Sequence, residues 1–237
     1  EWENQQRILI MAGTEFRSVE NFIDSLLNVG NLAQDAIFSI LDQPFEAGFY
    51  MLTQTWVPGD EWVNEFRMTS TADGEGRIAT LSMQNWTNSW QEGLLLEYSY
   101  DDQSRLDQII IKVSNNGSSL ENTMRMTRTY SDDGRPELDM IAFYADDSWI
   151  NQLRVSYTYD AEGNLTVRLS ETNLQIQWAA TGRVTMTYNA NQNLIEKVTE
   201  TSEGDGFTGQ IVLVNSQKEL FSYDADYNRT EHLYQNY

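Results

Sequence analysis

The sequence predicts a mainly β protein, an antiparallel up-and-down meander of about 12 strands built from hairpin repeats of about 29 residues. An N-terminal helical segment, residues 1–50, is expected to pack on the sheet formed by residues 51–237. Three observations predict this architecture. Tyrosines recur at a regular interval, apolar and polar residues alternate around them, and turn-forming residues follow them.

The helical segment is expected from the spacing of apolar residues near the N-terminus. Apolar residues at helical spacing run from Val19 to Leu27, after Ser18 as a candidate N-cap. A second short helix is expected from Leu32 to Leu41, ending before Pro44. Both predicted helices have an apolar stripe that must be buried. The helices are therefore expected to pack on the apolar face of the sheet and to cover it.

The repeat is most visible in a column of tyrosines separated by 30, 29, 29 and 35 residues: Tyr100, Tyr130, Tyr159, Tyr188 and Tyr223. Ten residues before each tyrosine stands a large apolar residue, and five residues after it stands Arg or Asn. An earlier copy fits with a slip of one residue at Thr71. The unit is therefore expected to be a strand, a tight turn after the tyrosine, a second strand and a looser turn rich in tryptophan.

The copy around Tyr159 is the clearest predicted hairpin. Apolar residues alternate with polar ones from Leu153 to Tyr159 and again from Leu165 to Leu169. Both apolar sets are expected on one face of the sheet, with Thr, Ser, Gln and Arg on the other. In the preceding copy, Leu138 and Met140 are expected on the apolar face. Since strands twist, a meander of this length is expected to curl into a barrel or half-barrel, with a flat or spiral ribbon as the alternative.

The turn sequences carry a family resemblance. Tyr98–Asp101 and Tyr157–Leu165, which contains Tyr-Thr-Tyr-Asp-Ala-Glu-Gly-Asn-Leu, resemble the Tyr-Asp repeats of the Rhs (YD-repeat) group. The linking segments Gln54–Asn64 and Asp146–Asn151 resemble those of secreted Bacteroidota-type repeat proteins with a Trp…Trp-Val-Asn pattern. The resemblance covers about residues 50–237. It implies an exported bacterial protein, extracellular or at the cell surface, of a kind that often uses type IX secretion.

Composition narrows the function. The net charge of −21 disfavours nucleic acid and anionic lipid as partners, and no apolar run is long enough to span a membrane as a helix. The absence of cysteine excludes disulfides, thiol nucleophiles and zinc–thiolate sites. The single histidine, His232, has no partner motif for a catalytic triad and is expected at the surface. We therefore expect that the protein is not an enzyme.

Two sets of side chains are candidate binding sites. Tryptophans beside Asn and Asp in the looser turns could stack on sugar rings, although packing on the sheet is the competing interpretation: Trp56, Trp62, Trp86, Trp90 and Trp149. Acidic pairs in loops could bind calcium, the one cofactor considered, although ordinary turn formation also explains them. These pairs are Asp73 with Glu75, Glu203 with Asp205, and Asp224 with Asp226.

The first functional hypothesis is a secreted or cell-surface structural scaffold that acts in assembly, adhesion or protein interaction. Its partners would be other extracellular or cell-surface proteins. The second hypothesis is a glycan-binding module that uses the tryptophan-rich turns. A third is an outer-membrane β-barrel, which the even strand number permits and the short, polar strands disfavour.

Overall fold

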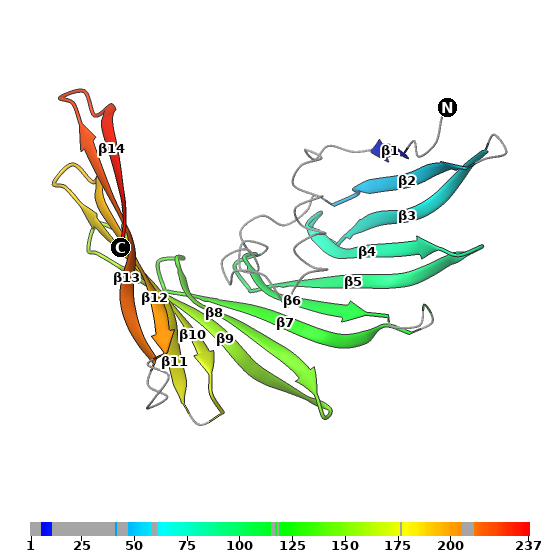
Figure 1. Cartoon of the computed structure of the whole chain (residues 1–237). Helices are drawn as coiled ribbons and strands as arrows, with labels where there is room; N and C mark the ends of the chain where they lie inside the picture. The colour runs from blue at the N-terminus through cyan, green and yellow to red at the C-terminus, as the bar shows by residue number, and fades with distance from the viewer. Residues whose placement is uncertain are drawn as a thin grey trace. The chain divides into compact units, whose positions relative to one another are not determined.

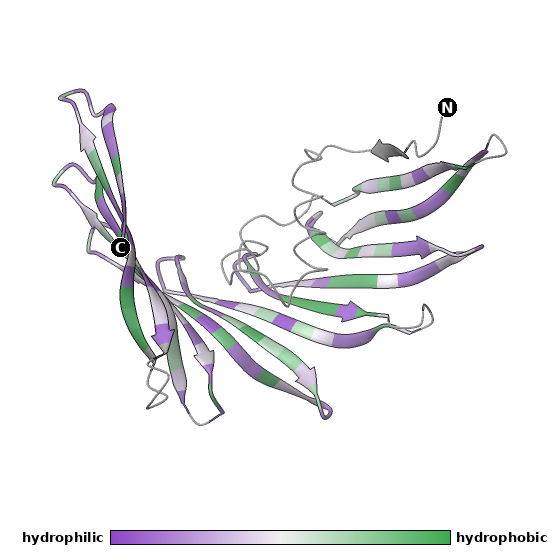
Figure 2. Ribbon diagram, viewed as in Figure 1, coloured by the Kyte–Doolittle hydropathy of each residue, from purple (hydrophilic) through white to green (hydrophobic). Residues whose placement is uncertain are grey.

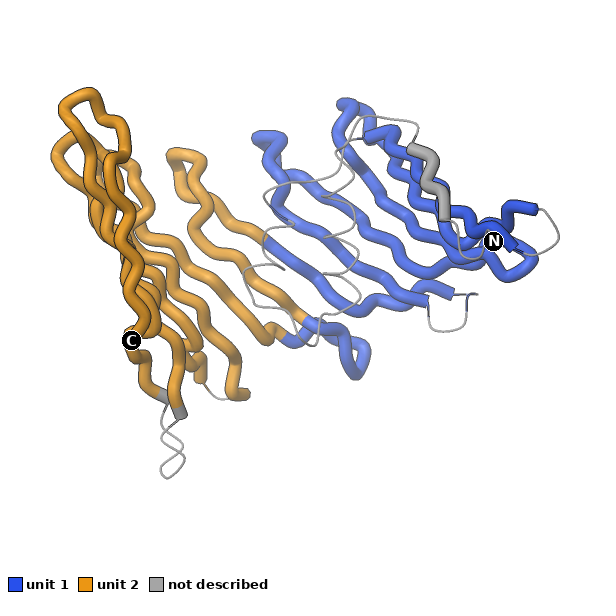
Figure 3. Tube along the Cα trace, turned by 45° about the horizontal axis from the view of Figure 1, so that its top comes forward, with its two compact units in different colours: residues 1–127, 143–150 blue, residues 128–142, 151–237 orange. Residues whose placement is uncertain are grey.

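The structure is a computed structural model, and it describes residues 6–10, 41, 47–57, 61–114, 117, 119–175, 177–204 and 211–237. The chain forms two compact units (Figure 3). Unit 1 contains residues 1–127 and 143–150, and unit 2 contains residues 128–142 and 151–237. The predicted division at residue 50 stays a prediction. In the part of the chain that is described, no helix has the length and apolarity needed to cross a membrane.

Fourteen strands follow one another in chain order, each hydrogen-bonded to its neighbours in sequence (Figure 1). They are β1 (Gln6–Ile10), β2 (Tyr50–Val57), β3 (Glu61–Ala72), β4 (Ile78–Trp86), β5 (Trp90–Tyr100), β6 (Leu106–Val113), β7 (Glu121–Tyr130), β8 (Pro136–Ala145), β9 (Ser148–Tyr159), β10 (Leu165–Asn173), β11 (Trp178–Tyr188), β12 (Leu194–Gly204), β13 (Ile211–Tyr223) and β14 (Arg229–Asn236). The prediction of a mainly β, antiparallel, up-and-down protein is confirmed. The twelve strands from β3 to β14 are the six expected hairpins. Among the described residues, the pairing of first and last strands that a closed barrel needs is not seen.

The start of the chain contains a strand that the sequence did not predict. Residues 6–10 form β1, which pairs antiparallel with β2. Its Ile-Leu-Ile run is a short apolar segment rich in β-branched residues, which favours a strand. The helices expected between residues 18 and 40 lie outside the described residues.

One face of unit 1 is a set of apolar rows that run across the strands. Residues directly opposite one another share a face, so the register defines each row. The first row is Met51, Met68, Met83, Leu94 and Val113, and the second is Ser70, Leu81, Leu96, Ile111 and Met124. Met68 and Leu96 are fully buried. Each such side chain stabilises the fold by about 1.5–3 kcal/mol.

The opposite face of unit 1 is polar, and its side chains bond from strand to strand. Arg67 donates to Gln84 at 2.6 Å, and Gln84 donates to Glu92 at 2.5 Å. Lys112 pairs with Glu97 at 2.8 Å. Apolar and polar residues alternate along these strands (Figure 2). The sequence alternation therefore identifies an apolar and a polar face in unit 1.

In unit 2 the alternation predicts the strands but not their common face. Val155 lies opposite Ser170, and Ser156 lies opposite Leu169. Since opposed residues share a face, Val155 and Leu169 lie on different faces, and the prediction that both apolar sets face one side is wrong. The cause is a register shift beside the turn, because one extra residue moves all later side chains of a strand to the other face.

Candidate functional site

The best-defined polar structure is a five-residue turn that joins the two strands of each hairpin from β3–β4 to β13–β14. The six turns are residues 73–77, 101–105, 131–135, 160–164, 189–193 and 224–228. In each, the first residue donates its N–H to the carbonyl of the fifth at 2.8–3.0 Å. The fourth residue donates to the carbonyl of the first at 2.9–3.2 Å and has a positive φ. That angle explains Gly134 and Gly163, as expected from the sequence.

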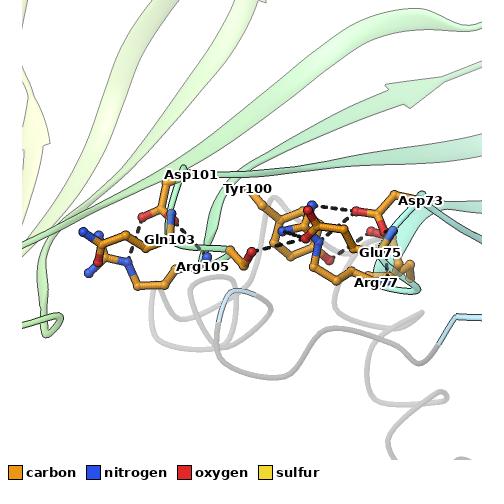
Figure 4. A network of polar contacts seen from close by, with 9 residues as sticks. Asp73, Glu75, Arg77, Tyr100, Asp101, Gln103 and Arg105 are labelled. Carbon is orange, nitrogen blue, oxygen red and sulfur yellow. Dashed lines mark hydrogen bonds and ion pairs between the residues drawn. The ribbon is translucent and has the colours of Figure 1, made fainter.

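The first side chain of the turn holds the loop closed. Oδ1 of Asp101 accepts the backbone N–H groups of Gln103 and Arg105, both at 2.9 Å, while Oδ2 accepts Nε of Arg105 at 2.7 Å. Asp73 and Arg77 make the same contacts (Figure 4). These are Asx turns closed by an ion pair. The turn is thus a closed loop of five residues in every hairpin, whereas the connections at the other end vary from two residues between β8 and β9 to seven between β6 and β7.

The repeated tyrosine links each hairpin to the one before it. The hydroxyl of Tyr100 donates to the carbonyl of Ile78 at 2.9 Å. Three other tyrosines donate in the same way to a backbone carbonyl of the preceding hairpin, at 2.9–3.0 Å: Tyr159 to Pro136, Tyr188 to Leu165 and Tyr223 to Leu194. In unit 1, the Arg77 guanidinium also lies 4.1 Å from the centre of the Tyr100 ring (Figure 4). The repeated tyrosines therefore have a structural role, since their hydroxyl groups connect each hairpin to the preceding one.

Most of the carboxylates predicted as calcium ligands lie in these turns. Asp73 and Asp224 are first residues of a turn, and their oxygens accept turn hydrogen bonds. Glu75 pairs with Arg77 at 3.0 Å. Asp226 is exposed in its turn, Glu203 is exposed near the end of β12, and Asp205 lies outside the described residues. Within the described ranges, no group of three or more acidic or histidine side chains is arranged to hold a metal.

The turn at residues 189–193 differs from the turns at 160–164 and 224–228 in one polar atom of its first side chain. Its first residue is Asn189, so an amide stands where Asp160 and Asp224 have a second carboxylate oxygen. Asn164 and Asn228 donate to that oxygen at 3.0 and 3.2 Å, whereas Nδ2 of Asn193 is buried with no acceptor. An unsatisfied donor of this kind destabilises the folded state.

Asn189→Asp is therefore expected to stabilise the protein by about 1 kcal/mol, because the new carboxylate accepts the Asn193 amide. Urea unfolding at neutral pH measures the change. In an Asn193→Ala background the same substitution should bring no gain. An equal gain in both backgrounds would contradict this explanation.

The turn aspartates also predict how stability depends on pH. Partial burial raises the pKa of Asp101, but the backbone and side-chain hydrogen bonds of Arg105 outweigh it and hold that pKa below 3.8. A carboxyl with a lowered folded pKa stabilises the protein above its unfolded pKa, and this contribution is lost as the pH falls through the folded pKa. The free-energy difference between the wild type and Asp101→Asn should therefore stay constant above about pH 5 and shrink below about pH 4. Urea unfolding across that range measures it, and a constant difference down to about pH 2 would contradict it.

The tryptophans form pairs at the other end of the hairpins. Trp56 and Trp62 are directly opposed, with ring centres 5.3 Å apart and planes at 69°. Trp86 and Trp90 repeat this edge-to-face contact at 5.1 Å and 68°. Trp149 contacts Tyr144 in the same way at 5.0 Å. All five tryptophans singled out from the sequence are half-buried.

Arginine side chains cover part of this aromatic surface. The Arg67 guanidinium lies 4.5 Å from the ring centre of Trp90, and that of Arg125 lies 5.0 Å from Trp149. Both contacts suit the attraction between a cation and an indole face. The pairs therefore have a structural role, and whether they also bind sugars stays a prediction.

A buried polar cluster in unit 2 was not expected from the sequence. Arg128 on β7 donates twice to Asp139 on β8, both at 2.7 Å, and Tyr157 on β9 donates to the same carboxylate at 2.6 Å. The side chains of Arg128 and Asp139 are 5% and 0% exposed. Burial, together with the Asp139 carboxylate, raises the pKa of the Tyr157 hydroxyl, so that it stays a donor.

The expectation that Leu138 and Met140 are the apolar face of β8 is wrong, because Asp139 and Ile141 are the fully buried residues there. Of this cluster, the alternation in the sequence signals only Arg128. Arg128 is in phase with the buried Met124 and Met126, and a charged residue in an apolar phase is the signal for a buried ion pair.

His232 lies on β14 and is partly exposed, as its expected surface position requires. Its Nε2 is 2.9 Å from Oε2 of Glu219, and its ring stacks on Phe221 with centres 4.6 Å apart. Hydrogen bonding from Lys197 lowers the pKa of Glu219, partial burial opposes this, and the His232 contact lowers it further. Both contacts of the imidazole are with β13, so His232 helps to hold β14 on its neighbouring strand.

No protein-family model and no curated protein matches this sequence. Similar solved structures include a protein of unknown function from Bacteroides fragilis, 13% identical, where the match covers 51% of this chain and 88% of that chain with a TM-score of 0.38. A DUF3836 family protein from Bacteroides vulgatus is 17% identical over 39% of this chain and 91% of its own, with a TM-score of 0.29. The TcdB2-TccC3-Cdc42 structure is 14% identical over 81% of this chain but 11% of that chain, with a TM-score of 0.39. These matches assign no family.

Proposed function

We propose that this protein is a non-catalytic repeat scaffold, exported to the cell surface or beyond, that acts in assembly or adhesion by contacting other extracellular proteins. One observation carries the proposal: the groups that could do chemistry are used to hold the repeats together. The turn aspartates accept the hydrogen bonds of their own loops, and the repeated tyrosines donate to the preceding hairpin. Such groups are poorly available to a substrate.

The resemblance of the turn sequences to YD repeats supports the same proposal. The Tyr-Asp pattern coincides with a structural unit that recurs six times, with conserved geometry from the Asp73 turn to the Asp224 turn. The net charge of −21 keeps such a surface soluble and disfavours polyanionic partners. Export is the expectation that the resemblance adds.

A panel of glycosidase, esterase, peptidase and phosphatase substrates tests the proposal. The protein is expected to give no turnover above that of a heat-denatured control. Turnover that is lost in a variant of one turn carboxylate, such as Asp160→Asn, would overturn the proposal, because that carboxylate would then have a catalytic role.

Glycan binding is the second candidate function. The observation in its favour is that two edge-to-face tryptophan pairs, Trp56–Trp62 and Trp86–Trp90, stand half-exposed at the same end of two neighbouring hairpins in unit 1. Aromatic side chains in such a row suit the faces of successive sugar rings.

A glycan array tests this second candidate. Binding should be lost when Trp56 and Trp86 are both replaced by Ala and kept when Trp178, in unit 2, is replaced instead. Binding that survives replacement of all four paired tryptophans would exclude these sites.

A further inference from the structure

The last strand of the sheet order, β14, is an exposed edge. Every residue of β14 is exposed, and within the described part of the chain β14 pairs with β13 alone. The exposed large hydrophobic residues of the described chain gather here, with six of eight on β13, on the turn after it, or on β14 and the residue that follows: Val212, Leu220, Tyr227, Leu233, Tyr234 and Tyr237. The remaining two are Ile150 and Leu174. An apolar edge of this kind is a template for pairing with another strand.

The edge lacks the features that usually prevent such pairing. β14 contains neither proline nor lysine, and its formal charge is zero because Arg229 offsets Glu231. The chain as a whole carries −21. A second copy therefore meets less electrostatic repulsion at this neutral strand than it would at the acidic surface of an average part of the protein.

The free backbone groups of β14 can be assigned from one hydrogen bond. The N–H of Tyr237 donates to the carbonyl of Ser216 at 3.2 Å, so Tyr237 directs its backbone groups toward β13. Along a strand the direction alternates with every residue. The N–H and C=O groups of His232, Tyr234 and Asn236 therefore point away from the sheet and are available to a partner strand.

We propose that β14 pairs antiparallel with β14 of a second copy of this chain, with Leu233 on the two-fold axis. This inference rests on the proposed scaffold function and names its partner. An antiparallel pair related by a two-fold axis places residues of the same face opposite each other, so the axis passes through one residue and its symmetry mate.

Charge and polarity favour Leu233 over Glu231 and His232 as that residue. An axis through Glu231 would oppose two carboxylates, and an axis through His232 would set Glu231 against Leu233. With the axis at Leu233, Glu231 faces Gln235 and His232 faces Tyr234, without any like-charge pair.

This register also continues the contacts already present. Leu233 lies opposite Leu220, so the axis completes a row of four leucines across two copies. The outward backbone groups of His232 then bond with those of Tyr234 in the partner. The interface is a single strand pair and buries little area, so the dimer is expected to be weak and visible only at high protein concentration.

Cysteine cross-linking tests the register, because the chain has no cysteine of its own. Opposed residues that lie between the hydrogen-bonded pairs have Cα atoms about 4.5 Å apart, which suits a disulfide. Leu233→Cys should therefore form a covalent dimer under mild oxidation. Gln235→Cys is the matched control, since its mates lie four residue positions apart, about 13 Å, too far for a disulfide.

Sedimentation equilibrium over about two decades of concentration tests the pairing itself. The wild-type mass should rise toward that of a dimer. Tyr234→Pro removes an outward N–H without touching the β13 ladder and should abolish the rise. Tyr234→Ala keeps that N–H and should retain it.

Three outcomes would overturn the proposal: a monomer at every concentration, equal cross-linking of the two cysteine variants, or a dimer that Tyr234→Pro does not weaken. The panel of enzyme substrates reports separately on the scaffold function. If the protein is a monomer and shows no turnover, a second copy is not its partner, but the scaffold function is not contradicted. If the protein shows turnover, the scaffold function is contradicted whatever mass sedimentation gives.

Discussion

Asp139→Asn is expected to lower the free energy of unfolding by about 3–5 kcal/mol. The substitution keeps the shape of the side chain, so no cavity forms. It removes the charge that compensates the buried Arg128 guanidinium, with which Asp139 makes two hydrogen bonds of 2.7 Å. Urea unfolding followed by circular dichroism measures the loss.

Two variants in unit 2 are controls for this prediction. Glu171→Gln breaks the pair with Arg154, whose side chain is 31% exposed, and should cost less than about 1 kcal/mol because water solvates the freed arginine. Tyr157→Phe removes one hydrogen bond to Asp139 and should cost about 1 kcal/mol. If Asp139→Asn lowers the free energy of unfolding no more than Glu171→Gln does, the buried ion pair is no more important for stability than the exposed one, and the prediction is wrong.

Leu96→Ala should destabilise unit 1 by about 3 kcal/mol, since it leaves a cavity in the middle of an apolar row. Leu96 is fully buried and lies opposite Leu81 on one side and Ile111 on the other. Leu95 is the matched control, because it is the next residue on the same strand and points to the polar face, opposite Ser82. Leu95→Ala should cost less than half as much.

The same unfolding measurement decides between the two faces of β5. Equal losses for Leu95→Ala and Leu96→Ala would contradict the assignment of the core face in unit 1. A larger loss at Leu95 would place the core on the other side of the sheet.

The scaffold function and the edge pairing depend on different parts of the molecule. The turns give a structural role to Asp73, Asp101 and their counterparts, and the described residues contain no metal cluster. The β14 edge explains why exposed apolar residues are concentrated at one strand. Each feature therefore has its own variants and its own measurement.

Much of the architecture is encoded locally, and the sequence by itself determined it. The tyrosine column, the Asx residue after it and the Arg or Asn five residues later define a turn whose hydrogen bonds join residues at most four positions apart. Local contacts of this kind depend on short stretches of chain, so a repeat in the sequence predicts a repeat in the structure. The number and order of the hairpins followed from it.

Only the tertiary structure decided which side of β8 and β10 is buried. The register shift beside the Tyr159–Asp160 turn exchanges the faces of β10, so the alternation assigned the buried side of β10 wrongly, as it also did for β8. The contact between Arg128 on β7 and Asp139 on β8 likewise depends on how two strands pair, and so does the burial of Asp139. The face of a strand is a property of its neighbours, because one residue of slip costs little locally and changes every contact across the sheet.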